Sequence, residues 1–103
     1  MTNIALVDDE ESILTSVSLS LESEGFSVDT FINGEEALIA LQNKPYDLGL
    51  FDIKMPKMDG NELLSKVRAS KDIKLKELPI IFLTSKDHEQ DEIIGLRMGA
   101  SDY

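Results

Sequence analysis

The stretch Leu48–Asp52, which reads LGLFD, decides how the rest of this sequence is interpreted. It is a short apolar run that ends on an acid, and an acidic side chain at such a place is costly to bury without a partner. Two further runs, IALV at 4–7 and PIIFLT at 79–84, are equally apolar, and acids follow the first of them directly. Short runs that are apolar throughout indicate strands covered by helices on both faces.

The segments between these runs have the spacing of amphipathic helices, except that residues 26–30 alternate like an edge strand and 71–78 form a charged connection. Residues of four segments define the expected helices: Ile13, Leu14, Val17 and Leu21 up to a stop at Gly25; Ala37, Leu38 and Leu41 between Asn33 and Pro45; Leu63, Leu64 and Val67 after the loop; and Ile93, Ile94 and Leu96 from Asp87 to Gly99.

Alternation of strands and helices predicts an α/β fold, a flavodoxin-like doubly wound parallel sheet with strand order 2-1-3-4. The chain reverses direction between the first and third strands, and ligands bind in such folds where the carboxyl ends of those strands meet. Asp8, Asp9 and Asp52 follow these two ends, and Thr84 ends the neighbouring strand.

Three carboxylates in one crevice repel one another, and a divalent cation relieves that repulsion. Carboxylate and carbonyl oxygens suit Mg²⁺, which would allow an Asp52 oxygen to attack phosphorus in line. Each residue also has a purely structural interpretation. Asp8 and Asp9 are common helix-capping residues, and Thr84 is a common β-branched strand end. Their joint occurrence on adjacent strand ends favours a site.

The composition of the chain limits the classes of function. Its 103 residues, 42% of them apolar, are expected to form one domain, 1–103. The net charge of −10 argues against nucleic-acid binding by this segment. There is no cysteine and no apolar stretch of membrane-spanning length, so we expect a soluble, cytoplasmic protein without membrane association.

Four motifs in this order resemble the receiver domains of response regulators (CheY-like), and the resemblance covers the whole chain. They are LVDDE at 6–10, LFDIKMPKMDG at 50–60, IIFLTSKD at 80–87 and MGASDY at 98–103. The residues of these motifs are similar to those of the OmpR/PhoB branch and, within it, to those of the ChvI type.

The resemblance implies a role for each matching position. Asp52 would be the phosphoacceptor and a ligand of Mg²⁺, with Asp9 as a direct ligand and Asp8 as a ligand through water. The remaining positions are the Lys54 backbone carbonyl as a third protein ligand, Thr84 and Tyr103 as switch residues, Ser85 at the entrance, and Pro56 and Gly60 in the loop around the acceptor.

The implied function is two-component signal transduction, in which a sensor histidine kinase transfers a phosphoryl group to Asp52. In this branch phosphorylation changes a surface that forms a homodimer, and DNA is reached through an output domain that these residues do not contain. Such a domain dephosphorylates itself and is not a turnover enzyme. In the family a fifth strand continues past the aromatic residue to a phosphate-binding lysine and a fifth helix, which this sequence does not reach, so we expect a C-terminally incomplete domain.

Two other functions fit parts of the sequence. A haloacid-dehalogenase-like phosphatase also uses an aspartate after a strand, but it needs a second acid two residues later, where this chain has Lys54. A receiver-like module that works by protein contact alone, without phosphorylation, is the second alternative.

Overall fold

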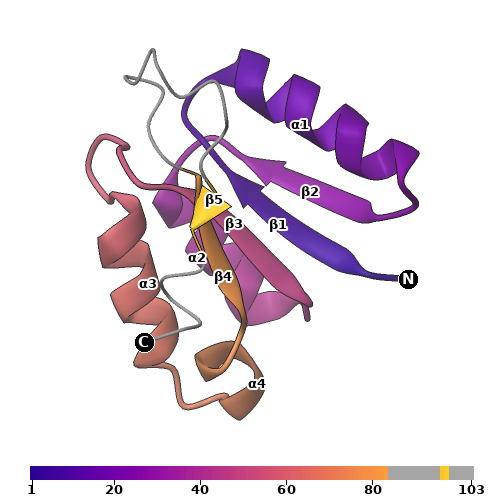
Figure 1. Ribbon diagram of the computed structural model, residues 1–103. Coiled ribbons are helices and arrows are strands. Elements are labelled where there is room, and N and C mark those ends of the chain that lie inside the picture. The colour runs from indigo at the N-terminus through magenta and orange to yellow at the C-terminus, as the bar shows by residue number, and fades with distance from the viewer. Residues whose placement is uncertain (84–95, 98–103) are drawn as a thin grey trace.

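The computed structural model describes residues 1–83 and 96–97 of the chain. Helices and strands alternate along it, as Figure 1 shows. In chain order they are β1 (Asn3–Val7), α1 (Glu11–Ser23), β2 (Ser27–Phe31), α2 (Gly34–Asn43), β3 (Leu48–Asp52), α3 (Gly60–Arg68), α4 (Ile73–Lys76), β4 (Ile80–Leu83) and β5 (Leu96–Arg97).

The strands form one sheet in the order β2-β1-β3-β4-β5. The first four strands run parallel, which confirms the predicted doubly wound topology and its order 2-1-3-4. Val7 of β1 pairs with Phe51 of β3, and Asp52 pairs with Leu83 of β4, so the carboxyl ends of these strands lie at one edge of the sheet.

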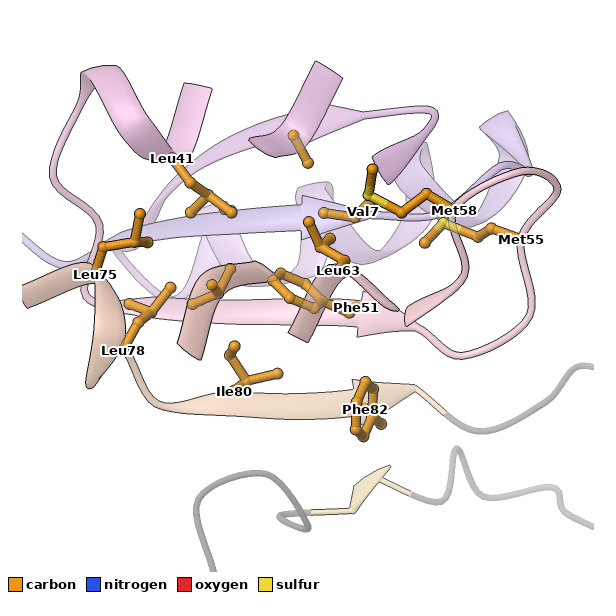
Figure 2. Close-up of a cluster of buried hydrophobic side chains, with 13 residues drawn as sticks. Val7, Leu41, Phe51, Met55, Met58, Leu63, Leu75, Leu78, Ile80 and Phe82 are labelled. Carbon is orange, nitrogen blue, oxygen red and sulfur yellow. The ribbon is translucent and has the colours of Figure 1, made fainter. Parts of the chain in front are cut away.

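Strand residues alternate between two apolar layers because successive side chains in a strand point to opposite faces. Ile4 and Leu6 belong to the layer under α1, whereas Ala5 and Val7 belong to the layer under α2, α3 and α4. Figure 2 shows the second layer, which closes around the fully buried ring of Phe51. Both faces of β1 and β3 are therefore covered, as their unbroken apolar sequences predict.

Two elements differ from the sequence-based expectation. Residues 71–78 contain the short helix α4, because the Asp72 carboxylate accepts a hydrogen bond from the backbone N–H of Lys74 (3.0 Å) and Leu75 is buried in the core. Leu96, expected in a helix, lies in β5 and pairs antiparallel with Leu83. Its strand satisfies backbone groups on the outer edge of β4 that would otherwise lack partners.

Within the described part of the chain, no helix combines the length and apolar character that crossing a membrane requires.

Candidate functional site

The carboxyl ends of β1 and β3 bring Asp8 and Asp52 together. Asp52 is the last residue of β3 and is 1% exposed, while Asp8 directly follows β1 and is 3% exposed. They are the only buried charged residues in the described part of the chain. Burial of two carboxylates at adjacent strand ends carries a high electrostatic cost, which indicates a function other than packing.

Asp9 completes the cluster from the exposed side. One carboxylate oxygen from each of Asp8, Asp9 and Asp52 lies within 4.8 Å of the others. At that separation two unit charges repel by roughly 3 kcal/mol at an effective dielectric constant of about 20. The arrangement suits a hard divalent cation, because all the side-chain donors are oxygen atoms and one side of the cluster is open to solvent.

Backbone hydrogen bonds fix the orientation of the two buried carboxylates. The Asp8 Oδ1 atom accepts from the N–H of Glu10 (2.9 Å), and the Asp52 Oδ1 atom accepts from the N–H of Lys54 (3.2 Å). Helix capping does not account for Asp9, because the N-cap residue of α1 is Glu10, and the Glu10 side chain makes no capping bond. The Asp8 and Asp9 pair is thus held at the cluster by the turn that precedes α1.

The loop from Ile53 to Asp59 returns to the acceptor strand. The N–H of Gly60 donates to the carbonyl of Ile53 (2.9 Å), and the Asp59 carboxylate caps α3 through the N–H of Glu62 (2.8 Å). Met55 and Met58 are buried in the core beneath the loop (Figure 2), so both methionines have a packing role. The loop is therefore held at both of its ends.

A glycine at position 60 is required by a close approach of α3 to β3. A Cβ atom built there would overlap the carbonyl oxygen of Asp52 and lie 3.0 Å from the Cα atom of Ile53. Gly60 was predicted to lie in the loop, but it is the first residue of α3. The need for a small residue there depends on how the helix packs against the strand, which the sequence does not show.

The structure therefore brings together Asp8, Asp9 and Asp52, with the Lys54 backbone beside the acceptor, Pro56 in the adjoining loop and Gly60 at the start of α3. Three predicted site residues, Thr84, Ser85 and Tyr103, lie outside the described residues. A contact that sequence analysis missed joins this loop to α2: a Cβ atom on Gly34 would lie 3.0 Å from both the carbonyl oxygen and the sulfur of Met58.

Comparison with known proteins agrees with this geometry. Residues 4–103 match the response regulator receiver domain family. The chain is 43% identical over 100 residues to the alkaline phosphatase synthesis transcriptional regulatory protein PhoP of Bacillus subtilis, covering 97% of this chain and 40% of that protein. It is 40% identical over 103 residues to the phosphate regulon transcriptional regulatory protein PhoB of Rhizobium meliloti, covering 100% and 44% respectively. This chain thus spans less than half the length of these relatives.

Solved structures share the fold. The response regulator protein TrrA of Thermotoga maritima, solved in complex with Mg²⁺-BeF, is 36% identical, with a TM-score of 0.78 over 99% of this chain and 83% of that one. The chemotaxis protein CheY4 of Vibrio cholerae is 35% identical, with a TM-score of 0.77 over 86% and 72%.

Proposed function

Because the chain belongs to the response regulator receiver domain family of two-component systems, we propose that it accepts a phosphoryl group on Asp52 from a sensor histidine kinase. The observation that carries this proposal is the buried Asp52 carboxylate, gathered with Asp8 and Asp9 within 4.8 Å. The resemblance to PhoP and PhoB supports placing the parent protein in the OmpR/PhoB branch, and we propose the ChvI type within it.

In the proposed reaction one Asp52 oxygen attacks the phosphorus of a phosphohistidine in line. A phosphorus–oxygen bond forms, the phosphorus–nitrogen bond breaks, and the imidazole leaves with the electron pair and is protonated by solvent. The Asp52 Oδ1 atom accepts from the N–H of Lys54, which fixes the orientation of the nucleophilic carboxylate. Hydrolysis by water then regenerates the carboxylate, so the domain is a self-resetting switch and not a turnover enzyme.

The donor set fits Mg²⁺, which would be held by Asp8, Asp9, Asp52 and the Lys54 carbonyl. When bound, the ion supplies positive charge that offsets the carboxylates and the incoming phosphoryl oxygens. The complex of the similar protein TrrA with Mg²⁺-BeF supports this assignment by analogy. The buried positions of Asp8 and Asp52 exclude bulk water from one side of the site and hold their oxygens in place.

The remaining assignments complete the switch. Thr84 binds a phosphoryl oxygen, Tyr103 follows it inward, and Ser85 controls access to the site. The altered surface then forms a homodimer, which brings output domains onto DNA. The names of PhoP and PhoB as transcriptional regulatory proteins support an output of this kind.

Phosphorylation with a small phosphoramidate tests the acceptor directly. Incubation of the chain with phosphoramidate and Mg²⁺ is expected to add one phosphoryl group, measured by intact mass, and peptide mapping should place it on Asp52. Asp52→Asn should abolish the addition. That variant keeps the carbonyl oxygen that receives the Lys54 N–H, so its fold should survive.

Glu35→Gln is the matched control, since it removes an exposed carboxylate from the first turn of α2 without touching the cluster. It should be phosphorylated like the unchanged chain. If the folded chain takes up no phosphoryl group, the alternative of an interaction module that is never phosphorylated is favoured. If Asp52→Asn is modified as fast as Glu35→Gln, the acceptor has been assigned wrongly.

A further inference from the structure

The basic residues of this acidic chain are concentrated at one place. No Lys or Arg occurs before Lys44, yet half of the 10 in the chain lie within residues 66–76. This segment covers the last turn of α3 and the whole of α4. In Figure 1, α4 lies at the start of β4, at the opposite end of the sheet from the carboxylate cluster.

Helix α4 is fixed rigidly although it is short. Leu75 is buried in the core at 7% exposure, and the Arg68 guanidinium donates to the carbonyls of Lys76 and Leu78, both at 2.8 Å. Ile73, at the other end of the helix, is 64% exposed. The Ile73 side chain is thus exposed to solvent on a helix that Leu75 and Arg68 attach to the rest of the domain.

Four exposed lysines surround this isoleucine in sequence, and we call them, with Ile73, the α4 surface: Lys66, Lys71, Ile73, Lys74 and Lys76. Within the part of the chain that the structure describes, none of these four lysines forms an ion pair with a carboxylate, in contrast to Lys44, which pairs with Asp29. The nearby Asp72 carboxylate is engaged in capping α4. The positive charge of the surface is therefore available to a partner.

A hollow of about 610 Å³ adjoins the α4 surface. It is lined by Lys74, Leu75 and Leu78, and by Leu41, Pro45 and Tyr46 from the end of α2 and the connection to β3. The carboxylates of Asp47, Asp72 and Glu77 also line it. The hollow offers apolar walls, so it suits an apolar side chain of a partner. Because its own carboxylates would repel acids inside it, the acids of such a partner would lie outside the hollow, over Lys66, Lys71 and Lys76.

We infer that the α4 surface binds an acidic segment of a partner protein, with one apolar side chain of that segment seated in the hollow. Charge complementarity selects the partner. A short segment can place its acids over the four lysines, which outnumber Asp72 and Glu77 at this surface, whereas a membrane or a nucleic acid extends far enough to meet the net charge of −10. The surface lies far from Asp52, so this inference does not rest on the proposed phosphorylation.

The test uses the full chain, labelled with ¹⁵N, and a synthetic peptide of glutamates around one leucine. We expect chemical-shift changes at the α4 surface and around the hollow, with an affinity that falls as salt rises. Lys74→Glu should weaken binding by about tenfold or more. Lys57→Glu is the matched control, because Lys57 is an exposed lysine of the β3–α3 loop at the other end of the sheet, and it should leave the affinity unchanged.

A second variant, Ile73→Ser, tests the apolar contribution without disturbing the fold, since Ile73 is largely exposed. It should weaken the binding of the leucine-containing peptide. Equal losses for Lys74→Glu and Lys57→Glu, or shift changes spread over the whole surface, would overturn the proposal. Tighter binding of phosphatidylglycerol vesicles or of duplex DNA than of the peptide would overturn the choice of partner.

Discussion

At the scale of single residues, Gly60 links the position of α3 to the position of the acceptor. Its N–H binds the carbonyl of Ile53, and its missing side chain leaves room for the carbonyl of Asp52. Neither neighbour is a flexible side chain, since both are backbone atoms at the end of a central strand. A larger residue at position 60 can only be accommodated if the helix moves away from the strand.

We therefore predict that Gly60→Ala destabilises the fold by about 1–3 kcal/mol, as overpacking of a tight contact does. The same displacement should slow phosphorylation of Asp52, because the acceptor strand and its loop shift together. Urea unfolding gives the first quantity and intact mass against time gives the second.

Gly25→Ala is a suitable control for this prediction. Gly25 has a φ of 97°, and no neighbouring atom lies within 4 Å of the place that a Cβ atom would take, so alanine costs about 1–2 kcal/mol through backbone strain alone. It should lose stability and keep its phosphorylation rate. An unfolding midpoint for Gly60→Ala equal to that of the unchanged chain would contradict the packing argument.

At the scale of elements, a polar cluster joins the edge strand β2 to the connection between α2 and β3. The Asp29 carboxylate accepts from the Lys44 ammonium (2.7 Å) and from the Tyr46 hydroxyl (2.5 Å). The hydrogen bond from Lys44 is the largest cause that lowers the pKa of Asp29 below its ordinary value of 3.8, followed by that from Tyr46. Burial, followed by the hydrogen bond that the Tyr46 hydroxyl donates to Asp29, raises the pKa of Tyr46 well above its ordinary value of 10.0.

These shifts predict how stability depends on pH. The lowered pKa of Asp29 means that the cluster contributes fully above about pH 4 and loses its contribution as the pH falls through the folded-state pKa. The raised pKa of Tyr46 means that the unfolded chain ionises first, so stability also declines above about pH 10. The Lys44 and Asp29 side chains are 49% and 37% exposed, so solvent limits the pair to about 0.5–1 kcal/mol.

Urea unfolding of Asp29→Asn and Tyr46→Phe over a range of pH measures these effects. Asp29→Asn should lack the loss of stability at acid pH that is attributed to this cluster. Tyr46→Phe should lack the decline in stability above about pH 10. Asp47→Asn is the control, because Asp47 belongs to the same connection but binds the N–H of Asn3 instead. A Tyr46→Phe variant that declines as steeply at alkaline pH as the unchanged chain would show that Tyr46 is not the cause.

How well each element was predicted from sequence depends on how local its cause is. The runs IALV and LGLF predict β1 and β3, because consecutive apolar residues in a strand point to both faces of the sheet and so indicate burial on both. Helix α4 has too few residues to show the spacing of apolar residues that indicates a helix. Its N-cap, Asp72, and its buried residue, Leu75, are both present in the sequence. The cluster of Asp29 with Lys44 and Tyr46 could not be predicted, because it requires the placement of residues that lie 15 and 17 positions apart.

At the scale of the whole molecule, the candidate site exists only because the topology assembles it. Asp8, Asp9 and Asp52 could be grouped from sequence once the strand order 2-1-3-4 was inferred, since parallel strands end at a common edge. The orientation of their oxygens depends on hydrogen bonds from the backbone N–H groups of Glu10 and Lys54. The spacing of residues in the sequence does not predict these bonds. The folded state therefore concentrates negative charge that the unfolded chain disperses.

This concentration of charge predicts that Mg²⁺ stabilises the folded chain. An ion that binds the folded state alone adds about 2.7 kcal/mol at a concentration about one hundred times its dissociation constant. Without Mg²⁺, Asp9→Asn should unfold at slightly higher urea than the unchanged chain, because it removes one member of a mutually repelling cluster. Asp9 is exposed, so solvent screening limits the gain to about 1 kcal/mol or less. With Mg²⁺ that order should reverse, because the variant has lost a carboxylate ligand.

The measurement is urea unfolding in chelator and in MgCl₂, with NaCl adjusted to equal ionic strength so that general screening of the net charge of −10 is the same in both. Glu36→Gln removes an equal charge from the exposed first turn of α2 and should keep the full response to Mg²⁺. If NaCl alone produces the same gain, or if Asp9→Asn responds to Mg²⁺ as strongly as Glu36→Gln, the three carboxylates do not form a metal site. Stabilisation that is specific to Mg²⁺ requires the cluster, because there several carboxylate oxygens lie close enough together to bind one ion.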